Sequence, residues 1–525
     1  MGTLQDGKFR ANDIEIVPRL LGSVPAGADG QLSPVTDQPG INLYVRKGGI
    51  LVPAVDATTA AKFATTEPIS MVVDRLTGVS PPAGTIVTTQ AQYDTLGASL
   101  RLPQDALRIL PPMLGDYVKV RCVAGDHWSD PTTLMLLFSP GRMFSIQGKS
   151  RTVVDPVLGS INRATIAFYG DTSVYTASQS GTYTGPRSIS CPTGTWTTNE
   201  LRGKFVWFLT GDGAGSRLPI RSNTATTIEL GATIEAGSGT FEVRQNDSYL
   251  LPTTNGTDTT RCFYLAGLSG DFVNLAYRFF DLNVGSAAKK RDLYVTDYAT
   301  QYYMRCSITL GVASFAGAVT SYLGFLYGHF TVNGSYPFAF YGPLQSFMIS
   351  SVIRGKITGL SADYPAPIVA MQGGHGSFDD CVVEPFDGAY AGALLGVLDG
   401  ELSLNFCLID GLTTAKGLVL CGADGVGSNP GSAQFVITGT QNINNCTTAL
   451  QVSAGRLVVI SPLSGSGNAK VFSISDGAEV KWKKSALTIT GTTYATIDGL
   501  DYPSSDFAAA GDGVEGRYGS SLDMT

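Results

Sequence analysis

Short apolar segments alternate with glycine turns in the last quarter of the chain. Each turn has the sequence Asp-Gly or Ala-Gly, and successive turn glycines are 25, 30, 22 and 22 residues apart. The glycines are Gly400, Gly425, Gly455, Gly477 and Gly499. Several of the apolar segments alternate apolar with small or polar residues, which is the period-two pattern of a strand with one buried face. A unit of this length cannot bury its apolar face alone, so the pattern predicts copies of it stacked as a solenoid.

The predicted fold is all-β: a right-handed parallel β-helix preceded by small β-rich modules and an irregular N-terminal attachment region. Leucine-rich repeats are the rival solenoid, but their fixed Leu and Asn positions and their helical segment are missing. The longer unit between Gly400 and Gly455 requires a loop, which residues 425–431 supply. The 63 glycines and the charged fraction of 15% agree with a β-rich, turn-rich chain. Short helices are expected at 58–65 and 91–96.

Four regions are expected along the chain. Residues 1–150 have no solenoid rhythm and are rich in proline, and we interpret them as an irregular β-rich region that attaches to a partner. Residues 151–250 form a small β module, residues 251–500 form the β-helix, and residues 501–525 form a tail or cap. The repeat is regular only from about residue 377, so the start of the β-helix stays open.

The charge balance argues against nucleic acid as a partner. The chain has 36 Lys and Arg against 43 Asp and Glu, whereas phosphate neutralisation needs clustered basic residues. No apolar stretch reaches the roughly 18 residues of a membrane span, and the N-terminus lacks the pattern of a signal peptide. The sequence therefore predicts a soluble protein that is not exported by the usual route and does not insert into a membrane.

The eight cysteines show no metal-binding pattern. None has CxxC or CxxH spacing, so a zinc site is not expected, and no sequence motif indicates another metal or a cofactor. Cys381, Cys407 and Cys446 lie in segments that resemble strands and could face inward in successive coils. We expect them to be reduced residues that pack in the core.

A resemblance to a known family is confined to three segments, residues 196–206, 210–215 and 220–230. In order they hold a Trp with a following Gly-Lys, a Gly-rich turn, and a strand with Ser222-Asn223-Thr224. This succession resembles a small β module of structural proteins of tailed bacteriophages, which often stands just ahead of a β-helix. The Gly-rich residues 211–215 are not expected to bind phosphate, because no Lys-Ser or Lys-Thr follows and Pro219 prevents a helix from starting there. We interpret them as a β-hairpin turn.

The resemblance implies a structural component of the phage virion, a tailspike or tail fibre or a spike on the head. It also implies a homotrimer whose N-terminal region binds other virion proteins and whose loops contact a host-surface glycan or protein, assembled in the host cytoplasm. Two alternatives stay open. The first is a tailspike glycan depolymerase, a hydrolase or lyase, and the second is a bacterial surface adhesin, which the missing signal peptide disfavours.

Tailspikes of this kind commonly cleave polysaccharide with two or three carboxylates on one face, which suggests candidate residues here. The carboxylates are Asp379, Asp380 and Glu384, and also Asp399 with Glu401. Adjacent Asp379 and Asp380 are expected to point to opposite faces of a strand, and Asp399 is sufficiently explained as a turn former. The prediction is therefore that no residue is catalytic, with Asp379, Asp380 and Glu384 as the weaker alternative.

Aromatic residues crowd the region between residues 322 and 341. They could fill the core and the contacts between chains, or they could stack on sugar rings. We favour packing, because Phe and Tyr dominate protein cores and interfaces. The cluster comprises Tyr322, Phe325, Tyr327, Phe330, Tyr336, Phe338, Phe340 and Tyr341.

Overall fold

The computed structural model describes most of the chain. The described residues are 3–5, 8–11, 14–16, 32–34, 43–47, 50–53, 65, 67–111, 117–128, 153–155, 159–161, 164–211, 213–251, 261–266, 275–285, 292–297, 300–310, 313–317, 321–334, 338–341, 344–357, 367–421, 434–437, 441–453, 456–459, 463–482, 487–507, 513–516 and 519–524.

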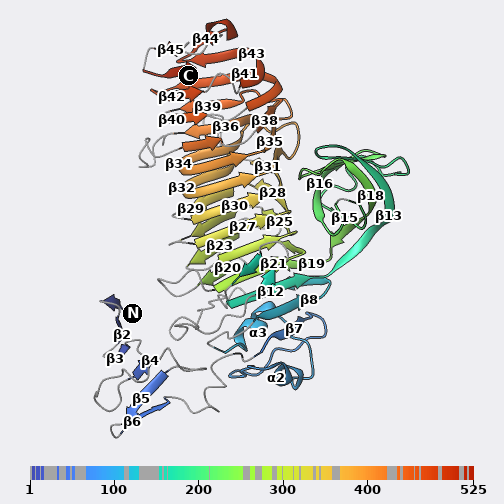
Figure 1. Cartoon of the computed structure of the whole chain (residues 1–525), viewed down its shortest axis with the longest axis vertical. Helices are drawn as coiled ribbons and strands as arrows, with labels where there is room; N and C mark the ends of the chain where they lie inside the picture. The colour runs from blue at the N-terminus through green and yellow to red at the C-terminus, as the bar shows by residue number, and fades with distance from the viewer. Residues whose placement is uncertain are drawn as a thin grey trace.

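Within these residues, parallel strands form a 32-stranded sheet that coils into an elongated solenoid (Figure 1). Three ladders run along it, and in each ladder a strand pairs in parallel with the strand of the next coil. Ladder A contains β7 (Ile69–Val73), β8 (Val118–Cys122), β12 (Ala164–Gly170), β21 (Leu275–Phe280), β24 (Thr300–Met304), β27 (Ser321–Leu326), β30 (Leu344–Ile349), the second parts of β32 (Pro367–Asp379) and β34 (Ala393–Asn405), β37 (Gln434–Ile437), β40 (Arg456–Val459), β42 (Glu479–Trp482) and β46 (Ser521–Met524). Ladder B contains β9 (Gly125–Trp128), β19 (Ser248–Leu251), β22 (Leu282–Val284), β25 (Ser307–Leu310), β28 (His329–Gly334), β31 (Val352–Ile357), β33 (Val382–Pro385), β35 (Leu408–Asp410), β38 (Gln441–Asn444) and the first parts of β41 (Leu463–Ser475) and β43 (Leu487–Ile497). Ladder C contains β20 (Arg261–Ala266), β23 (Asp292–Asp297), β26 (Ala313–Gly317), β29 (Phe338–Tyr341), the first parts of β32 and β34, β36 (Lys416–Cys421), β39 (Leu450–Ser453) and the second parts of β41 and β43.

The ladders confirm the parallel β-helix predicted from the turn repeat. Gly400, Gly477 and Gly499 have φ of 86, 74 and 84°, as the predicted turns require. Gly425 and Gly455 lie outside the described residues. The strands predicted on either side of the turns are present in β34, β36, β37, β39, β40, β41, β42 and β43.

The solenoid core consists of side chains stacked in register from coil to coil. In ladder A, Phe168, Phe279, Tyr303 and Phe325 pair in this order and are buried, with ring centroids 5.3, 4.8 and 5.3 Å apart. Each such ring contributes roughly 1.5–3 kcal/mol through burial of its apolar surface. Of the aromatic cluster weighed above, Phe325 and Phe330 are core residues with centroids 4.4 Å apart, so the packing interpretation is confirmed for these two. The side chains of Tyr322, Tyr336, Phe338, Phe340 and Tyr341 lie outside the described residues.

A short helical segment covers the N-terminal edge of the solenoid. In α2 (Gln90–Asp94), the Gln90 side chain accepts from the Ser70 backbone N–H (2.7 Å) and donates to the Ser70 carbonyl (3.1 Å). The Tyr93 hydroxyl does the same for Val72, at 2.8 and 3.3 Å. Two side chains thus bind backbone groups at the edge of β7, and the Leu100 backbone pairs with Val72 and Asp74 beside them. The helix expected at 91–96 is present as α2; α3 (Pro103–Arg108) was not expected, and the helix expected at 58–65 falls almost wholly outside the described residues.

The C-terminal end is also closed. β44 (Leu500–Tyr502) folds back antiparallel on β43, and β45 (Gly513–Glu515) pairs antiparallel with β46, which completes ladder A. Phe507 and Leu522 are fully buried there. The described residues after Gly499 thus fold against the last coils of the solenoid.

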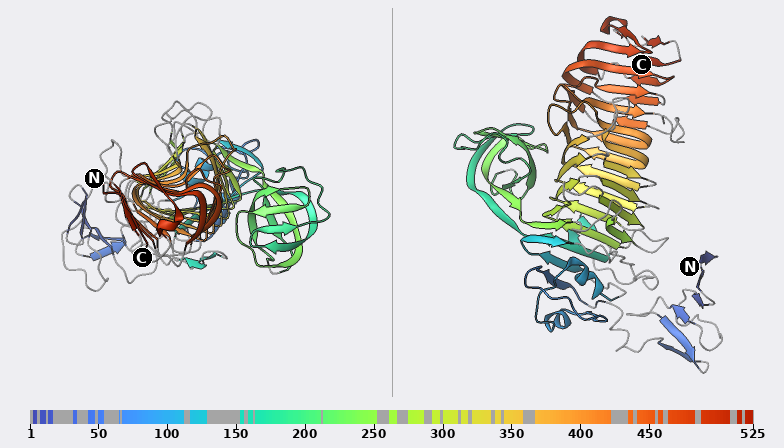
Figure 2. Two further views of the ribbon diagram at one scale, coloured as in Figure 1. Left: turned by 90° about the horizontal axis from the view of Figure 1, so that it is seen from above. Right: turned by 180° about the vertical axis from the view of Figure 1, so that it is seen from behind.

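A closed barrel is inserted between β12 and β19 and lies beside the solenoid (Figure 2). Its strands are β13 (Thr172–Gly185), β14 (Ser188–Ser190), β15 (Phe205–Phe208), β16 (Arg217–Asn223), β17 (Thr227–Leu230) and β18 (Gly237–Asn246), in the order β13-β14-β17-β16-β15-β18. The barrel has its own core, which includes Trp196, Phe208 and Phe241. The Gly-rich residues join antiparallel β15 and β16, with the Gly215 N–H donating to the Phe208 carbonyl at 2.8 Å, so the hairpin turn is confirmed.

The solenoid begins earlier in the chain than the sequence predicts. β7, β8 and β12 already belong to ladder A, ahead of the expected start at residue 251, because the barrel interrupts the β-helix rather than preceding it. β9 likewise belongs to ladder B, and the described strands ahead of the barrel that lie outside the ladders form small antiparallel sheets: β1 (Thr3–Gln5), β2 (Lys8–Ala11) and β3 (Ile14–Ile16); β4 (Leu32–Pro34), β5 (Leu43–Lys47) and β6 (Ile50–Pro53); and β10 (Val153–Asp155) with β11 (Gly159–Ile161). The described helices include none that is long and apolar enough to cross a membrane.

Candidate functional site

The candidate carboxylates lie at the corner where the chain passes from ladder A to ladder B, here called the A/B corner. Among the described residues, six non-glycine residues form it in successive coils, with φ between 48 and 55°. They are Asp281, Arg305, Tyr327, Ser350, Asp380 and Phe406. The corner N–H of one coil donates to a carbonyl of the next, for example Asp380 to Asn405 at 2.9 Å. Positive φ turns each corner side chain outward, and the barrel contacts this corner.

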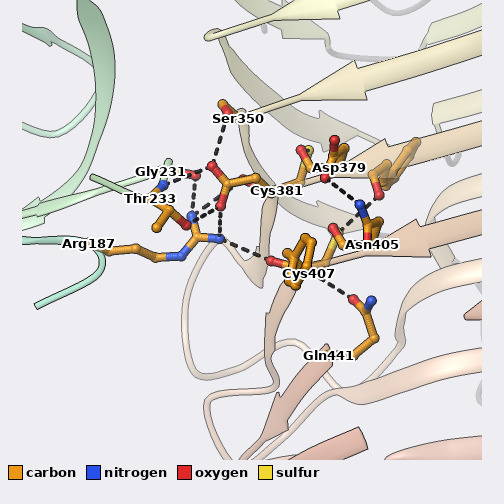
Figure 3. Close-up of polar contacts among 12 residues, drawn as sticks. Arg187, Gly231, Thr233, Ser350, Asp379, Cys381, Asn405, Cys407 and Gln441 are labelled. Atoms are coloured by element: carbon orange, nitrogen blue, oxygen red, sulfur yellow. Dashed lines mark hydrogen bonds and ion pairs between the residues drawn. The ribbon is translucent and has the colours of Figure 1, made fainter. Parts of the chain in front are cut away.

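Asp380 is bound by two residues of the barrel and by Ser350 of the preceding coil (Figure 3). Its carboxylate accepts from Arg187 Nη2 at 2.6 Å, from the Thr233 backbone N–H at 2.8 Å and hydroxyl at 2.5 Å, and from Ser350 Oγ at 3.0 Å. Arg187 also donates to the carbonyls of Gly231 (2.6 Å) and Phe406 (3.3 Å). A carboxylate has about four lone-pair positions, so these donors saturate Asp380. It holds the barrel and has no position left for a ligand.

Glu384 is likewise occupied, by two arginines. Arg221 Nε of the barrel donates to it at 2.7 Å, and Arg354 of the neighbouring coil donates through both Nε (2.9 Å) and Nη2. Arg221 also donates to Asp410, at 2.9 Å. Burial works to lower the pKa of Arg221, but the two carboxylates outweigh it and raise the pKa. The Glu384 side chain is only 5% exposed, so it is a buried bridge between barrel and solenoid.

The lower part of the corner has a further ion-pair chain and a buried histidine. Asp281 accepts from Arg217 of the barrel and from Arg305 of the next coil, both at 2.8 Å. His329 Nε2 lies 2.9 Å from the Lys204 carbonyl of the barrel, and burial lowers the pKa of this imidazole to about 3. The histidine is therefore neutral at ordinary pH and donates to the carbonyl.

Asp379 differs from its two neighbours. It ends β32 on the outer face of ladder A, accepts one hydrogen bond from Asn405 Nδ2 (3.0 Å), and is partly exposed. Burial, and next the charge of Asp380, raise the pKa of Asp379. The two neighbours have different partners: Asp380 stands at the corner with a φ of 52° and binds Arg187 of the barrel, whereas Asp379 is the last residue of β32 and binds Asn405.

Asp399 and Glu401 lie in one strand, on either side of a bend. Gly400 has φ of 86° and stacks on Gly374 of the coil below, so Asp399 directly precedes a tight bend, as its interpretation as a turn former requires. Glu401 pairs in register with His375. Asp379 is separated from Glu401 by the length of the strand, since it pairs with Asn405 instead.

Cys306, Cys381 and Cys407 directly follow residues of the A/B corner, and Cys446 follows Asn445, which also has a positive φ of 52°. Cys306, Cys381, Cys407 and Cys446 are buried free thiols, and Cys381 and Cys407 donate to carbonyls of the preceding coil at 3.5 and 3.4 Å (Figure 3). Burial raises the pKa of Cys306 and Cys446 to about 12. The prediction of inward, reduced packing cysteines is confirmed for Cys381, Cys407 and Cys446. In the described part of the chain, no three His, Cys, Asp or Glu side chains gather in a way that could hold a metal ion.

Sequence reasoning missed the arginines that organise this site. Arg187, Arg217 and Arg221 all come from the barrel module, and their acidic partners lie far downstream in the solenoid. The five arginines of this module, in a chain with only 15% charged residues, were a visible signal. Their partners were not visible, because only the docking of the barrel brings the two segments together.

Comparison with known proteins gives weak matches in structure. No family model and no curated protein matches the sequence. Among solved structures, the tailspike of Acinetobacter baumannii bacteriophage AP22, in complex with A. baumannii capsular saccharide, is 10% identical, with a TM-score of 0.23 over 72% of this chain and 71% of that one. The tailspike of Pseudomonas phage phi297 is also 10% identical, with a TM-score of 0.20 over 74% of this chain and 71% of that one. Both TM-scores are low, so the fold of this chain rests on its own strand ladders: it is a parallel β-helix with a closed barrel inserted and docked at the A/B corner.

Proposed function

We propose that the chain is a structural component of a bacteriophage particle, a projecting spike or fibre of the tail or head that contacts the host surface. One observation carries the proposal. The segment whose sequence resembles a module of phage structural proteins folds as a closed barrel, and this barrel is bound to the side of a long β-helix through Asp281, Asp380 and Glu384. A stack of coils closed at both ends suits a rod that must project from a particle without polymerising through its edges.

The assembly belongs to the same proposal. The N-terminal region binds other virion proteins, three copies associate, and the β-helix projects towards a host glycan or protein, after assembly in the host cytoplasm. An electron-microscopy map of the intact particle tests the location, and competition of the purified protein with phage adsorption tests host contact. Absence of the chain from the particle would refute the proposal. Mass photometry tests the trimer, and a monomer at micromolar concentration would contradict it.

Glycan cleavage is a second candidate, favoured by Asp379, a partly exposed carboxylate at the end of β32 whose pKa is raised by burial and next by the charge of Asp380. A glycosidase needs a proton donor, and a carboxyl group whose pKa is raised by burial suits that role. We propose that Asp380 and Glu384 are structural and that Asp379 is the residue to test. If the protein shortens host capsule or lipopolysaccharide, Asp379→Asn should abolish cleavage while Ser377→Ala, on the same face, keeps it. No cleavage across a panel of host glycans would exclude this candidate.

A further inference from the structure

The barrel bridges six successive coils of the solenoid at the A/B corner. It binds Asp281 through Arg217, the Arg305 carbonyl through Asn246, and His329 through the Lys204 carbonyl. In the next three coils it binds Arg354, Asp380 with Glu384, and Asp410 with the Phe406 carbonyl. A solenoid by itself has contacts only between neighbouring coils, so its coils can open nearly independently. A body that binds six of them at once adds coupling that the stack lacks.

The order of these contacts along the chain is also unusual. The last barrel strand ends at Asn246, and the solenoid residues that the barrel binds come later in the chain. Arg305 lies 59 residues after its partner Asn246, and Phe406 lies 219 residues after its partner Arg187. The barrel has closed strands and a core of its own, so its folding does not require the solenoid. Its docking does require the solenoid, because the partners occupy one line only after the coils have stacked.

The contacts are sensitive to strand register. A slip of one residue in a strand reverses the direction of its side chains, and a shifted corner would move Asp380 away from its four donors. The partners on both sides are largely buried: the side chains of Arg187 and Asp380 are 12% and 18% exposed, and those of Arg221 and Glu384 are 18% and 5% exposed. Buried charges without partners are strongly unfavourable. The docked state is therefore compatible only with correctly stacked coils.

We propose that the barrel is a register clamp: it docks last, only on six coils stacked in register, and joins them into one cooperative unit. This inference concerns the fold itself and does not depend on the proposed function. It predicts that weakening one contact of the clamp loosens coils that are remote from that contact. A stack without a clamp predicts loosening only in the adjacent coils.

Hydrogen exchange followed by mass spectrometry on the full chain separates these outcomes. Arg187→Met removes the cation at Asp380, and we expect exchange to rise about tenfold in β33 and β35 and also in β22 and β25, several coils away. Lys356→Met is the matched control, because Lys356 pairs with Asp387 (3.0 Å) inside the same part of the solenoid and without the barrel. We expect its effect to stay within β31 and β33.

The proposal fails if the Arg187→Met effect is confined to β32–β35. If this variant does not fold, Thr233→Val provides the same readout, because it removes only the hydroxyl contact to Asp380. We then expect a rise of about threefold in the same remote strands, in keeping with the loss of one hydrogen bond. Arg187→Lys, which keeps the charge but not the fork of donors, should give an intermediate effect. Equal exchange in wild type and Thr233→Val in β22 and β25 would also contradict the clamp.

Discussion

Tyr327 and Phe406 are bulky aromatic residues with φ of 54 and 51°. Glycine adopts this backbone region easily, whereas bulky residues rarely adopt it. At Tyr327 this conformation is held by a bond to the next coil, because its N–H donates to the Ile349 carbonyl at 2.9 Å, and the corner N–H of Asp380 bonds to the Asn405 carbonyl in the same way. The strain at single residues is thus offset by a continuous ladder of backbone hydrogen bonds. The same geometry turns corner side chains outward, and this is how Asp281 and Asp380 reach the barrel.

His329 gives a pH-dependent prediction at this scale. Its pKa is about 3 in the folded chain, whereas the ordinary pKa of a histidine side chain, which applies to the unfolded chain, is 6.5. Between these two pH values the unfolded state therefore binds more protons than the folded state. The free energy of unfolding should therefore fall as the pH drops from about 6.5 to about 3, by up to about 1.4 kcal/mol per pH unit from this residue.

Urea denaturation at several pH values checks this prediction. His329→Gln keeps a donor for the Lys204 carbonyl and does not titrate, so its stability should depend less steeply on pH than that of the wild type. Equal pH dependence of the two proteins would show that His329 does not contribute.

At the scale of elements, edges and bends decide which strands can stack. α2 closes the first edge with two side chains, and the C-terminal hairpins close the other. The bend at Gly400 lets a coil pass close to the one below it. These devices lie at positions where a regular ladder would otherwise leave unpaired backbone groups or a steric clash.

Two glycines separate the effect of the bend from that of close packing. Gly400 and Gly499 have nearly the same φ, 86 and 84°, but a Cβ on Gly400 would lie 2.4 Å from the Gly374 carbonyl oxygen, whereas nothing lies within 4 Å of one on Gly499. Gly499→Ala should lower the free energy of unfolding by about 1–2 kcal/mol, the usual penalty for Ala at positive φ. Gly400→Ala should lower it clearly more, since backbone must move. Denaturant titration of both variants measures the difference, and equal losses would refute the role of close packing.

The N-terminal edge gives a prediction about association. Gln90→Ala combined with Tyr93→Phe removes the side-chain bonds to both Ser70 and Val72, which opens this part of the edge of β7 to another strand. We expect concentration-dependent oligomers beyond the wild-type state, measured by light scattering after size exclusion. Arg101→Ala, an exposed change near the same cap, is the control and should leave the size unchanged. A double variant with the wild-type size would show that the edge is protected in another way.

On the scale of the whole molecule, the barrel and the solenoid are held together by contacts that are spread over six coils and include largely buried ion pairs. Salt screens exposed charges within about 3 Å at 1 M against about 10 Å at 0.1 M, but it screens buried pairs much less. We therefore expect small-angle X-ray scattering to give the same distance distribution at both salt concentrations. A distribution that broadens at high salt would show a barrel that swings away from the solenoid.

An exposed ion pair should matter much less than these buried ones. The side chains of Arg456 and Glu479 are 59% and 38% exposed, so Glu479→Gln should change the free energy of unfolding by less than about 1 kcal/mol.

The sequence by itself determined the repeat and therefore the β-helix. Regularly spaced turns with φ-tolerant glycines and alternating apolar segments leave a chain few other ways to bury its surface, and these are local properties that a sequence displays. It also determined the hairpin at residues 211–215 and the packing of Cys381, Cys407 and Cys446, for the same reason. Only the tertiary structure decided that the barrel interrupts the solenoid and docks on it, and that Asp380 and Glu384 bind arginines of the barrel while Asp379 does not. Those facts depend on contacts between residues up to 219 positions apart, and no local pattern of residues encodes which distant charge will be the partner.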